Sequence, residues 1–192
     1  MPDNALEPAL QALYSGQVIG LPTDTVYGIG ADPMQRAAVA RLFEVKERPE
    51  IMPIPILAAS IEDLRPIAVI NADVAALADS HWPGALTLIL RRVPGTPDWV
   101  GDPKRDTVGI RIPDHPLALE LLAAFGPLAV TSANRSGADA AVDAASARAD
   151  LGDSISVYLA GAATGGAAST VVDLSGDRPR VLREGPVGWA LS

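Results

Sequence analysis

The chain has 192 residues with 23 acidic and 15 basic side chains, and its formal net charge of −8 argues against nucleic-acid binding by charge alone. Hydrophobic residues make up 48% of the chain and charged residues 20%, which excludes an intrinsically disordered protein. The absence of cysteine excludes disulfides, thiolate metal sites and Cys nucleophiles, and the two histidines leave little for a His-rich metal site.

Strand-length apolar runs alternate with stretches of helical periodicity from one end of the chain to the other. The runs that we expect to be strands are 18–21, 54–58, 86–90, 108–112, 128–131, 155–159, 170–174 and 180–183. The expected helices are 5–14, 35–45, 72–79, 117–125 and 143–149. The alternation predicts an α/β fold, and because no linker or repeat divides the chain we expect residues 1–192 to form one domain.

Export and membrane signals are not expected. The start of the chain carries acidic and no basic side chains, unlike a signal peptide. The apolar runs are too short, and too often broken by proline, to cross a bilayer. The sequence therefore predicts a cytoplasmic protein with no membrane partner.

Two loops rich in small polar residues follow expected strands, Pro22–Gly30 and Thr131–Gly137. Because open α/β sheets bind ligands at the carboxyl ends of their strands, we expect both loops to face a ligand at the same edge of the sheet. Plain turns, capped by their own side chains, are the alternative. Gly28–Pro33 lacks the third glycine of a dinucleotide fingerprint, the chain has no Walker-type Gly-Lys-Ser/Thr, and Ser132 lacks the Gly-x-Ser-x-Gly elbow of a hydrolase.

Two cations, Lys46 and Arg48, stand at the end of the expected 35–45 helix, which Pro49 is expected to end. Two neighbouring cations suit a polyphosphate. The alternative is that they only complement the negative end of the helix dipole.

Arg111 alternates with apolar residues on an expected strand, where it shares a face with Gly109. Such an arginine suits bidentate recognition of a carboxylate, and a solvated strand face is the alternative. His115 is expected to help begin a helix and His81 to pack against apolar residues, so neither histidine is assigned to catalysis.

Short motifs in a fixed order, from about residue 18 to residue 183, resemble those of the YrdC/Sua5 family of L-threonylcarbamoyladenylate synthases. The motifs are Pro22–Gly28, Phe43–Pro49, Trp82–Thr87, Val108–Pro113, Thr131–Asn134, Ser169–Asp173 and Leu182–Arg183. The resemblance implies an open, twisted, mainly mixed β-sheet flanked by helices, with a concave basic cavity. It also implies an adenylyltransferase that makes threonylcarbamoyl-AMP and pyrophosphate from ATP, L-threonine and bicarbonate or CO2, for the N6-threonylcarbamoyladenosine modification of tRNA.

The resemblance assigns roles to individual residues. The positions that match ATP contacts are Lys46, Arg48, Met52, Thr107, Ser132, Asn134, Ala140 and Arg183. The positions that match threonine contacts are Thr25, Leu57, Arg111, Val130 and Ser169. Lys46 and Arg48 are expected to be catalytic by neutralising charge at the phosphates, with Mg2+ bound to the ATP phosphates and no organic cofactor. Many relatives carry Lys or Asn at Met52, Ser is common at Ala140, and some archaeal members carry His at Leu57, so individual contacts are expected to be weaker.

The resemblance also leaves an alternative function open. A module of the same fold could bind double-stranded RNA or tRNA through its cavity, and the net charge of −8 argues against tight nonspecific binding of that kind. A carbamoyl-transfer domain of a hydrogenase maturation factor is a second rival, but such domains sit in much longer, Cys-rich chains. The chain resembles the short form of the family, without the additional C-terminal domain, and its downstream partner is expected to be a tRNA threonylcarbamoyl transferase complex.

Overall fold

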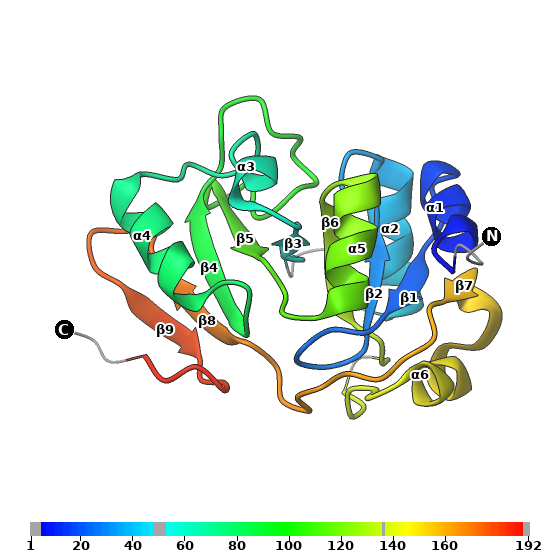
Figure 1. Cartoon of the computed structure of the whole chain (residues 1–192). Coiled ribbons are helices and arrows are strands. Elements are labelled where there is room, and N and C mark those ends of the chain that lie inside the picture. Colours follow the sequence, from blue (N-terminus) through cyan, green and yellow to red (C-terminus); the bar gives the residue numbers. More distant parts are fainter. Residues whose placement is uncertain (1–4, 48–52, 136, 190–192) are drawn as a thin grey trace.

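The computed structural model describes residues 5–47, 53–135 and 137–189, in which the strands form one mixed sheet flanked by helices (Figure 1). In sheet order the strands are β7 (Val157–Tyr158), β1 (Ile19–Leu21), β2 (Gly28–Ala31), β6 (Leu128–Ser132), β3 (Ile56–Leu57), β5 (Thr107–Arg111), β4 (Leu86–Arg91), β8 (Thr170–Asp173) and β9 (Arg180–Arg183). The helices are α1 (Glu7–Tyr14), α2 (Arg36–Val45), α3 (Ile61–Leu64), α4 (Ala72–His81), α5 (Pro116–Phe125) and α6 (Ala144–Leu151).

The mixed character of the sheet confirms the predicted α/β fold. β7 pairs with β1, β3 with β5, and β4 with β8 in parallel, whereas the other neighbours pair antiparallel. In Figure 1 α4 and β9 lie at one end of the sheet, and α1, α6 and β7 lie at the other. No helix in the described part of the chain is long and apolar enough to cross a membrane.

The prediction of a loop through Gly30 is wrong at its C-terminal end, because Gly28–Ala31 form β2 between β1 and β6. Glycine weakens a strand, which is why composition argued for a loop. In the structure a Cβ on Gly28 would lie 3.0 Å from Cγ1 of Val130. The glycine therefore allows a close approach to β6 that a larger residue would obstruct.

Helix α2 ends at Val45, before the chain reaches the proline that was expected to end it. Lys46 follows as the C-cap, and Glu47 adopts the left-handed conformation with φ of 52°. Pro49 lies outside the described residues. Two further short elements were not expected from the sequence: α3, which the Ser60 side chain caps by accepting a hydrogen bond from the Asp63 N–H, and a 3-10 turn over 152–154.

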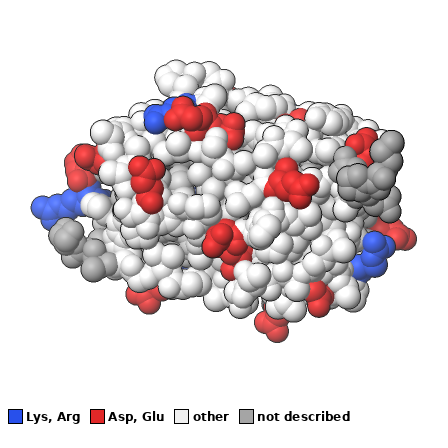
Figure 2. All heavy atoms as spheres, viewed as in Figure 1, with Lys and Arg blue, Asp and Glu red and all other residues white. Residues whose placement is uncertain are grey.

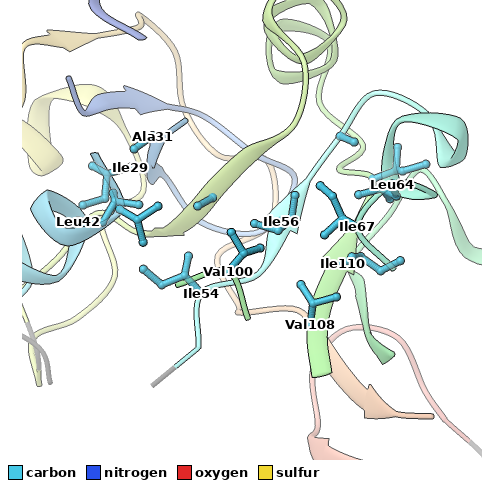
Figure 3. Packing of buried hydrophobic residues seen from close by; sticks show 14 of the residues in the cluster. Ile29, Ala31, Leu42, Ile54, Ile56, Leu64, Ile67, Val100, Val108 and Ile110 are labelled. Atoms are coloured by element: carbon cyan, nitrogen blue, oxygen red, sulfur yellow. The ribbon is translucent and has the colours of Figure 1, made fainter. Parts of the chain in front are cut away.

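The core divides between two clusters because neighbouring strand residues point to opposite faces. On β3, Ile56 belongs to a cluster that includes residues of α2 and of the other central strands, and in Figure 3 it lies beside Val100. The next residue, Leu57, packs instead with α1 and α5. Consecutive residues of one strand thus serve different sides of the sheet, and this alternation also shapes the cavities described below.

Candidate functional site

The strand register brings the two predicted ligand-facing loops together. Leu21, at the end of β1, pairs with Gly28 at the start of β2, and Gly28 pairs with Ser132 at the end of β6. The 22–27 segment and the segment after β6 therefore leave the sheet at the same edge, which confirms the predicted common location of the two loops.

A cavity of about 270 Å³ opens beside these segments. It is lined from seven parts of the chain: the 23–28 segment, residues 53–57, β4, β5, β6, the 168–171 segment and β9. Its polar side chains are Thr23, Thr25, Thr87, Arg111, Thr131, Ser132, Ser169 and Arg183. Gly109 contributes no side chain, which leaves space beside Arg111 on the same face of β5.

Arg111 is 5% exposed and is held by each of its side-chain nitrogens. Nε donates to the Gly84 carbonyl at 2.9 Å, Nη1 donates to Thr25 Oγ1 at 3.0 Å, and Nη2 donates to the Asp24 carboxylate. Burial lowers the pKa of Arg111, and the Asp24 carboxylate opposes that shift. A guanidinium carries five N–H groups, so two remain for a ligand and their direction is set by the three that are used.

The hydroxyl groups of the 22–27 segment form a chain with a defined direction. Thr23 Oγ1 donates to the Val26 carbonyl at 2.7 Å, so the 2.9 Å contact between the Thr23 and Thr25 hydroxyls takes its proton from Thr25. Thr25 in turn accepts from Arg111. Its remaining lone pair can accept a hydrogen bond, so Thr25 suits a protonated group such as an ammonium or a hydroxyl.

A second polar cluster lies at the other side of the cavity. Arg183 donates from Nε to the Ser169 carbonyl at 2.8 Å and from Nη2 to Ser169 Oγ at 3.0 Å. Ser169 Oγ lies 2.8 Å from Thr87 Oγ1. Thr87 and Ser169 are each 4% exposed, so the cavity wall holds buried hydroxyls beside a cation.

Lys46 lies behind the cavity, where it is 4% exposed. Its Nζ is within 2.7–3.2 Å of four oxygens: the carbonyl and the hydroxyl of Ser132, and the carbonyl and the side-chain oxygen of Asn134. Asn134 also donates from Nδ2 to the carbonyls of Arg135 and Ala138. The lysine thus anchors the segment after β6 and joins it to the end of α2.

The structure brings together all the residues that match threonine contacts, since each of them lines the cavity: Thr25, Leu57, Arg111, Val130 and Ser169. The residues that match ATP contacts are more dispersed. Ser132 and Arg183 line the cavity and Lys46 and Asn134 adjoin it, whereas Thr107 and Ala140 line neither this cavity nor the one described next. Arg48 and Met52 lie outside the described residues.

Among the residues given no role from the sequence are Thr87, which lines the cavity, and Asp24, which pairs with Arg111 beside it. Both stand inside motifs that carried the resemblance, Pro22–Gly28 and Trp82–Thr87. Alternation along β4 was a usable signal for Thr87, because a polar residue between the apolar Leu86 and Leu88 must face away from their core.

A larger cavity of about 500 Å³ lies on the opposite face of the sheet. Ile56 and Ala129 line it, and their neighbours Leu57 and Val130 line the smaller one. Its floor is apolar. Its charged residues, Arg36, Asp98, Asp102 and Lys104, lie on the partly or fully exposed rim.

The resemblance implied a basic cavity, but the charged side chains among the described residues do not make this cavity strongly basic. Arg111 and Arg183 line the smaller cavity, while Asp24 offsets the charge of Arg111. Figure 2 shows acidic side chains scattered over one face of the molecule, with Lys and Arg near its margins. Among the described residues no group of three or more His, Asp or Glu side chains could hold a metal ion.

Comparison with known proteins points to the same family as the sequence motifs. Residues 11–185 match the Sua5/YciO/YrdC family model, described as telomere recombination. The chain belongs to this family. It is 46% identical over 181 residues to a Mycobacterium tuberculosis protein provisionally named threonylcarbamoyl-AMP synthase, with 93% of this chain and 83% of that protein covered.

Two further members of the family are informative. A Vibrio cholerae threonylcarbamoyl-AMP synthase is 38% identical over 164 residues, which cover 83% of this chain and 87% of that protein. The crystal structure of P. abyssi Sua5 in complex with L-threonine superposes with a TM-score of 0.86 at 37% identity, over 92% of this chain and 53% of that one. The chain thus spans about half the length of the Sua5 protein.

Proposed function

We propose that the protein is a threonylcarbamoyl-AMP synthase, which makes threonylcarbamoyl-AMP and pyrophosphate from ATP, L-threonine and bicarbonate. The observation that carries the proposal is the cavity beside Arg111. All five residues that match threonine contacts line this cavity. Family members of 38–46% identity bear the name of this activity, and a Sua5 relative was crystallised with L-threonine.

The cavity chemistry suits an amino acid. The two unused N–H groups of Arg111 can bind the carboxylate of threonine, because a guanidinium matches a carboxylate in geometry and charge. The free lone pair of Thr25 can accept from its amine or hydroxyl. Leu57 and Val130 offer apolar contact to the methyl group. The substrate is thereby held with its amine at a fixed position.

The reaction needs positioning and charge neutralisation rather than a protein nucleophile. Threonine's amine and bicarbonate give an N-carboxylate and water. One oxygen of this carboxylate then forms a bond to the α-phosphorus of ATP, and the bond from that phosphorus to the bridging oxygen breaks, so that the electron pair leaves with pyrophosphate. Both reactants are anionic, and cations beside them stabilise the charge that develops in the transition state.

In this proposal the positive charges of Lys46 and Arg48 offset the negative charge of the phosphates, and Ser132, Asn134 and Arg183 contribute further contacts to ATP. Lys46 already holds the Ser132–Asn134 segment, so the cation and the hydrogen-bonding loop are placed as one unit. Mg2+ enters as part of the ATP complex, because the described residues offer no carboxylate cluster of their own. The product would be consumed by a transferase that modifies tRNA.

The test is pyrophosphate release from Mg-ATP by the purified protein, with L-threonine and bicarbonate each omitted in turn. Mass spectrometry of the quenched reaction should detect threonylcarbamoyl-AMP only when both are present. Release that does not depend on threonine, or no release by folded protein, would refute the proposal.

A variant of the phosphate-facing site tests the role of the lysine. Lys46→Ala should lower the rate of adenylate formation by about a hundredfold or more, because removing a preorganised charge contact costs roughly that in similar sites. Arg65→Ala, which removes an exposed cation that is paired with Glu62 and lines neither cavity, is the control. Circular dichroism should show that both variants stay folded, and near-normal turnover by Lys46→Ala would contradict the role.

A further inference from the structure

Thr87 occupies a position that the assigned roles leave unused. It lies on β4 with its side chain on the cavity face, opposite Val171 of β8, which in turn pairs with Arg183 of β9. Its hydroxyl lies 2.8 Å from Ser169 Oγ. Its methyl group faces Gly109, since a Cβ on that glycine would sit 3.5 Å from Thr87 Cγ2. The rotamer is therefore set by neighbours on both sides.

Counting protons in this cluster shows that one donor is left over. Arg183 donates to Ser169 Oγ, and within the described residues the only other contact of either hydroxyl is the one that joins them. Two hydroxyls carry two protons, and their mutual hydrogen bond uses one. The other proton has no protein acceptor, although both oxygens are nearly buried in the cavity wall.

The cation decides which hydroxyl keeps the unused proton. Ser169 Oγ accepts from Arg183, which polarises its own O–H bond and favours donation to Thr87 Oγ1. The hydrogen bonds then run in one direction, from Arg183 through Ser169 to Thr87. Thr87 ends the chain as a donor that faces the cavity, and a chain that starts at a cation favours an anionic acceptor.

We propose that Thr87 is a substrate-binding residue that donates its hydroxyl proton to a carboxylate oxygen in the cavity. This inference rests on the proposed synthase function. In that reaction two sources supply such an oxygen, the carboxylate of threonine and the carboxylate that bicarbonate adds to its amine. Arg111, fixed by Asp24 and Thr25, holds one side of the ligand, and the chain of hydrogen bonds from Arg183 holds the other.

Two variants separate the hydroxyl from the shape of the side chain. Thr87→Val keeps the β-branched shape and replaces only the hydroxyl, and it suits a strand. Thr87→Ser keeps the hydroxyl and removes the methyl. Pyrophosphate release is measured for both and for the wild type, with L-threonine, bicarbonate and ATP varied one at a time while the other two are saturating. Thermal unfolding is recorded for each protein.

Thr87→Val should lower kcat/KM for threonine or for bicarbonate by about tenfold or more, because it leaves a buried acceptor unpaired. kcat/KM for ATP should stay within about threefold, and Thr87→Ser should stay within about threefold of the wild type for all three substrates. A loss confined to threonine identifies the amino-acid carboxylate as the acceptor, and a loss confined to bicarbonate identifies the added carboxylate.

Other outcomes overturn the inference. Thr87→Val with wild-type constants, an equal loss for all three substrates, or Thr87→Ser as impaired as Thr87→Val would each show that the hydroxyl binds no substrate. If Ser169→Ala is impaired while Thr87→Val is not, the serine is the terminal donor and the inference is wrong. In all these cases the wild type still turns over. A wild type that releases no pyrophosphate refutes the proposed function, and the inference with it.

Discussion

The two cavities lie on opposite faces of one sheet and are lined by consecutive residues of the same strands. On β3, Leu57 faces the smaller cavity and Ile56 the larger, and on β6 Val130 and Ala129 divide in the same way. The larger cavity, at about 500 Å³ against about 270 Å³, has an apolar floor and charges only at its rim. The smaller cavity holds its polar groups in the wall.

The comparison teaches that volume alone does not identify the site. At the larger cavity the guanidinium of Arg36 lies 5.8 Å from the ring centre of the exposed Trp99, where solvent screens its charge. At the smaller one Arg111 is buried and fixed by three neighbours. A buried, oriented cation recognises an anion more strongly than an exposed one, because little reorganisation is needed.

The largest expected effect comes from exchanging the arginine of each cavity. Arg111→Lys keeps a positive charge beside Asp24 but loses the planar fork, so we expect kcat/KM for threonine to fall by about a thousandfold, roughly 4 kcal/mol. Arg36→Lys, at the larger cavity, should leave kcat/KM for threonine within about twofold of the wild-type value. Steady-state kinetics with threonine varied gives the answer. Equal losses in the two variants would remove the distinction between the cavities.

A core substitution on the same strand as Thr87 should change stability instead of binding. Leu88 is fully buried on the apolar face of β4, and Leu88→Ala should lower the free energy of unfolding by about 2–5 kcal/mol through lost burial and a new cavity. Urea denaturation measures this loss. Below the unfolding transition the threonine KM should change little, and a large rise in KM would show that the two faces are not independent.

Filling each cavity offers a smaller and matched test. A Cβ at Gly109 would lie 3.3 Å from Cβ of Pro55, so Gly109→Val reduces the space beside Arg111, and we expect kcat/KM for threonine to fall by about tenfold. Ala40→Val adds similar bulk to the larger cavity and should leave turnover unchanged. The same fall in both variants would mean that added bulk acts through the fold rather than through the site.

The smallest expected effect concerns a charge on β8 outside both cavities. Burial raises the pKa of Asp173, but hydrogen bonds from Ser175 and the ion pair with Arg105 outweigh it and hold that pKa below its usual value. Asp173→Asn should lower the free energy of unfolding by about 1 kcal/mol at neutral pH without changing turnover.

The direction of the pH dependence follows from that lowered pKa. The carboxylate stabilises the fold above its unfolded pKa of about 3.9, and this contribution is lost as the pH falls through the lower folded value. The difference in unfolding free energy between the wild type and Asp173→Asn should therefore be constant from pH 7 to about 5 and shrink below about 4. A difference that does not begin to shrink as the pH falls below about 4 would show that the carboxylate charge is not its source.

The sequence by itself determined most of the architecture and the identity of many cavity residues. Apolar periodicity located nearly every strand and helix, because burial of one face imposes a period of 2 or 3.6. Motif order pointed to the family, and the residues matched to threonine all line the cavity. β2 was missed because its glycines serve a contact with Val130 that no local pattern reveals.

Only the tertiary structure decided how those residues work together. The chain from Arg183 through Ser169 to Thr87 joins β9, the segment before β8, and β4, and the three bonds of Arg111 reach two loops distant in sequence. Hydrogen-bond direction depends on which donors and acceptors lie close together in space. The register of the strands determines which of them do. The sequence specifies the groups, and their arrangement in the sheet determines which proton is left for a substrate.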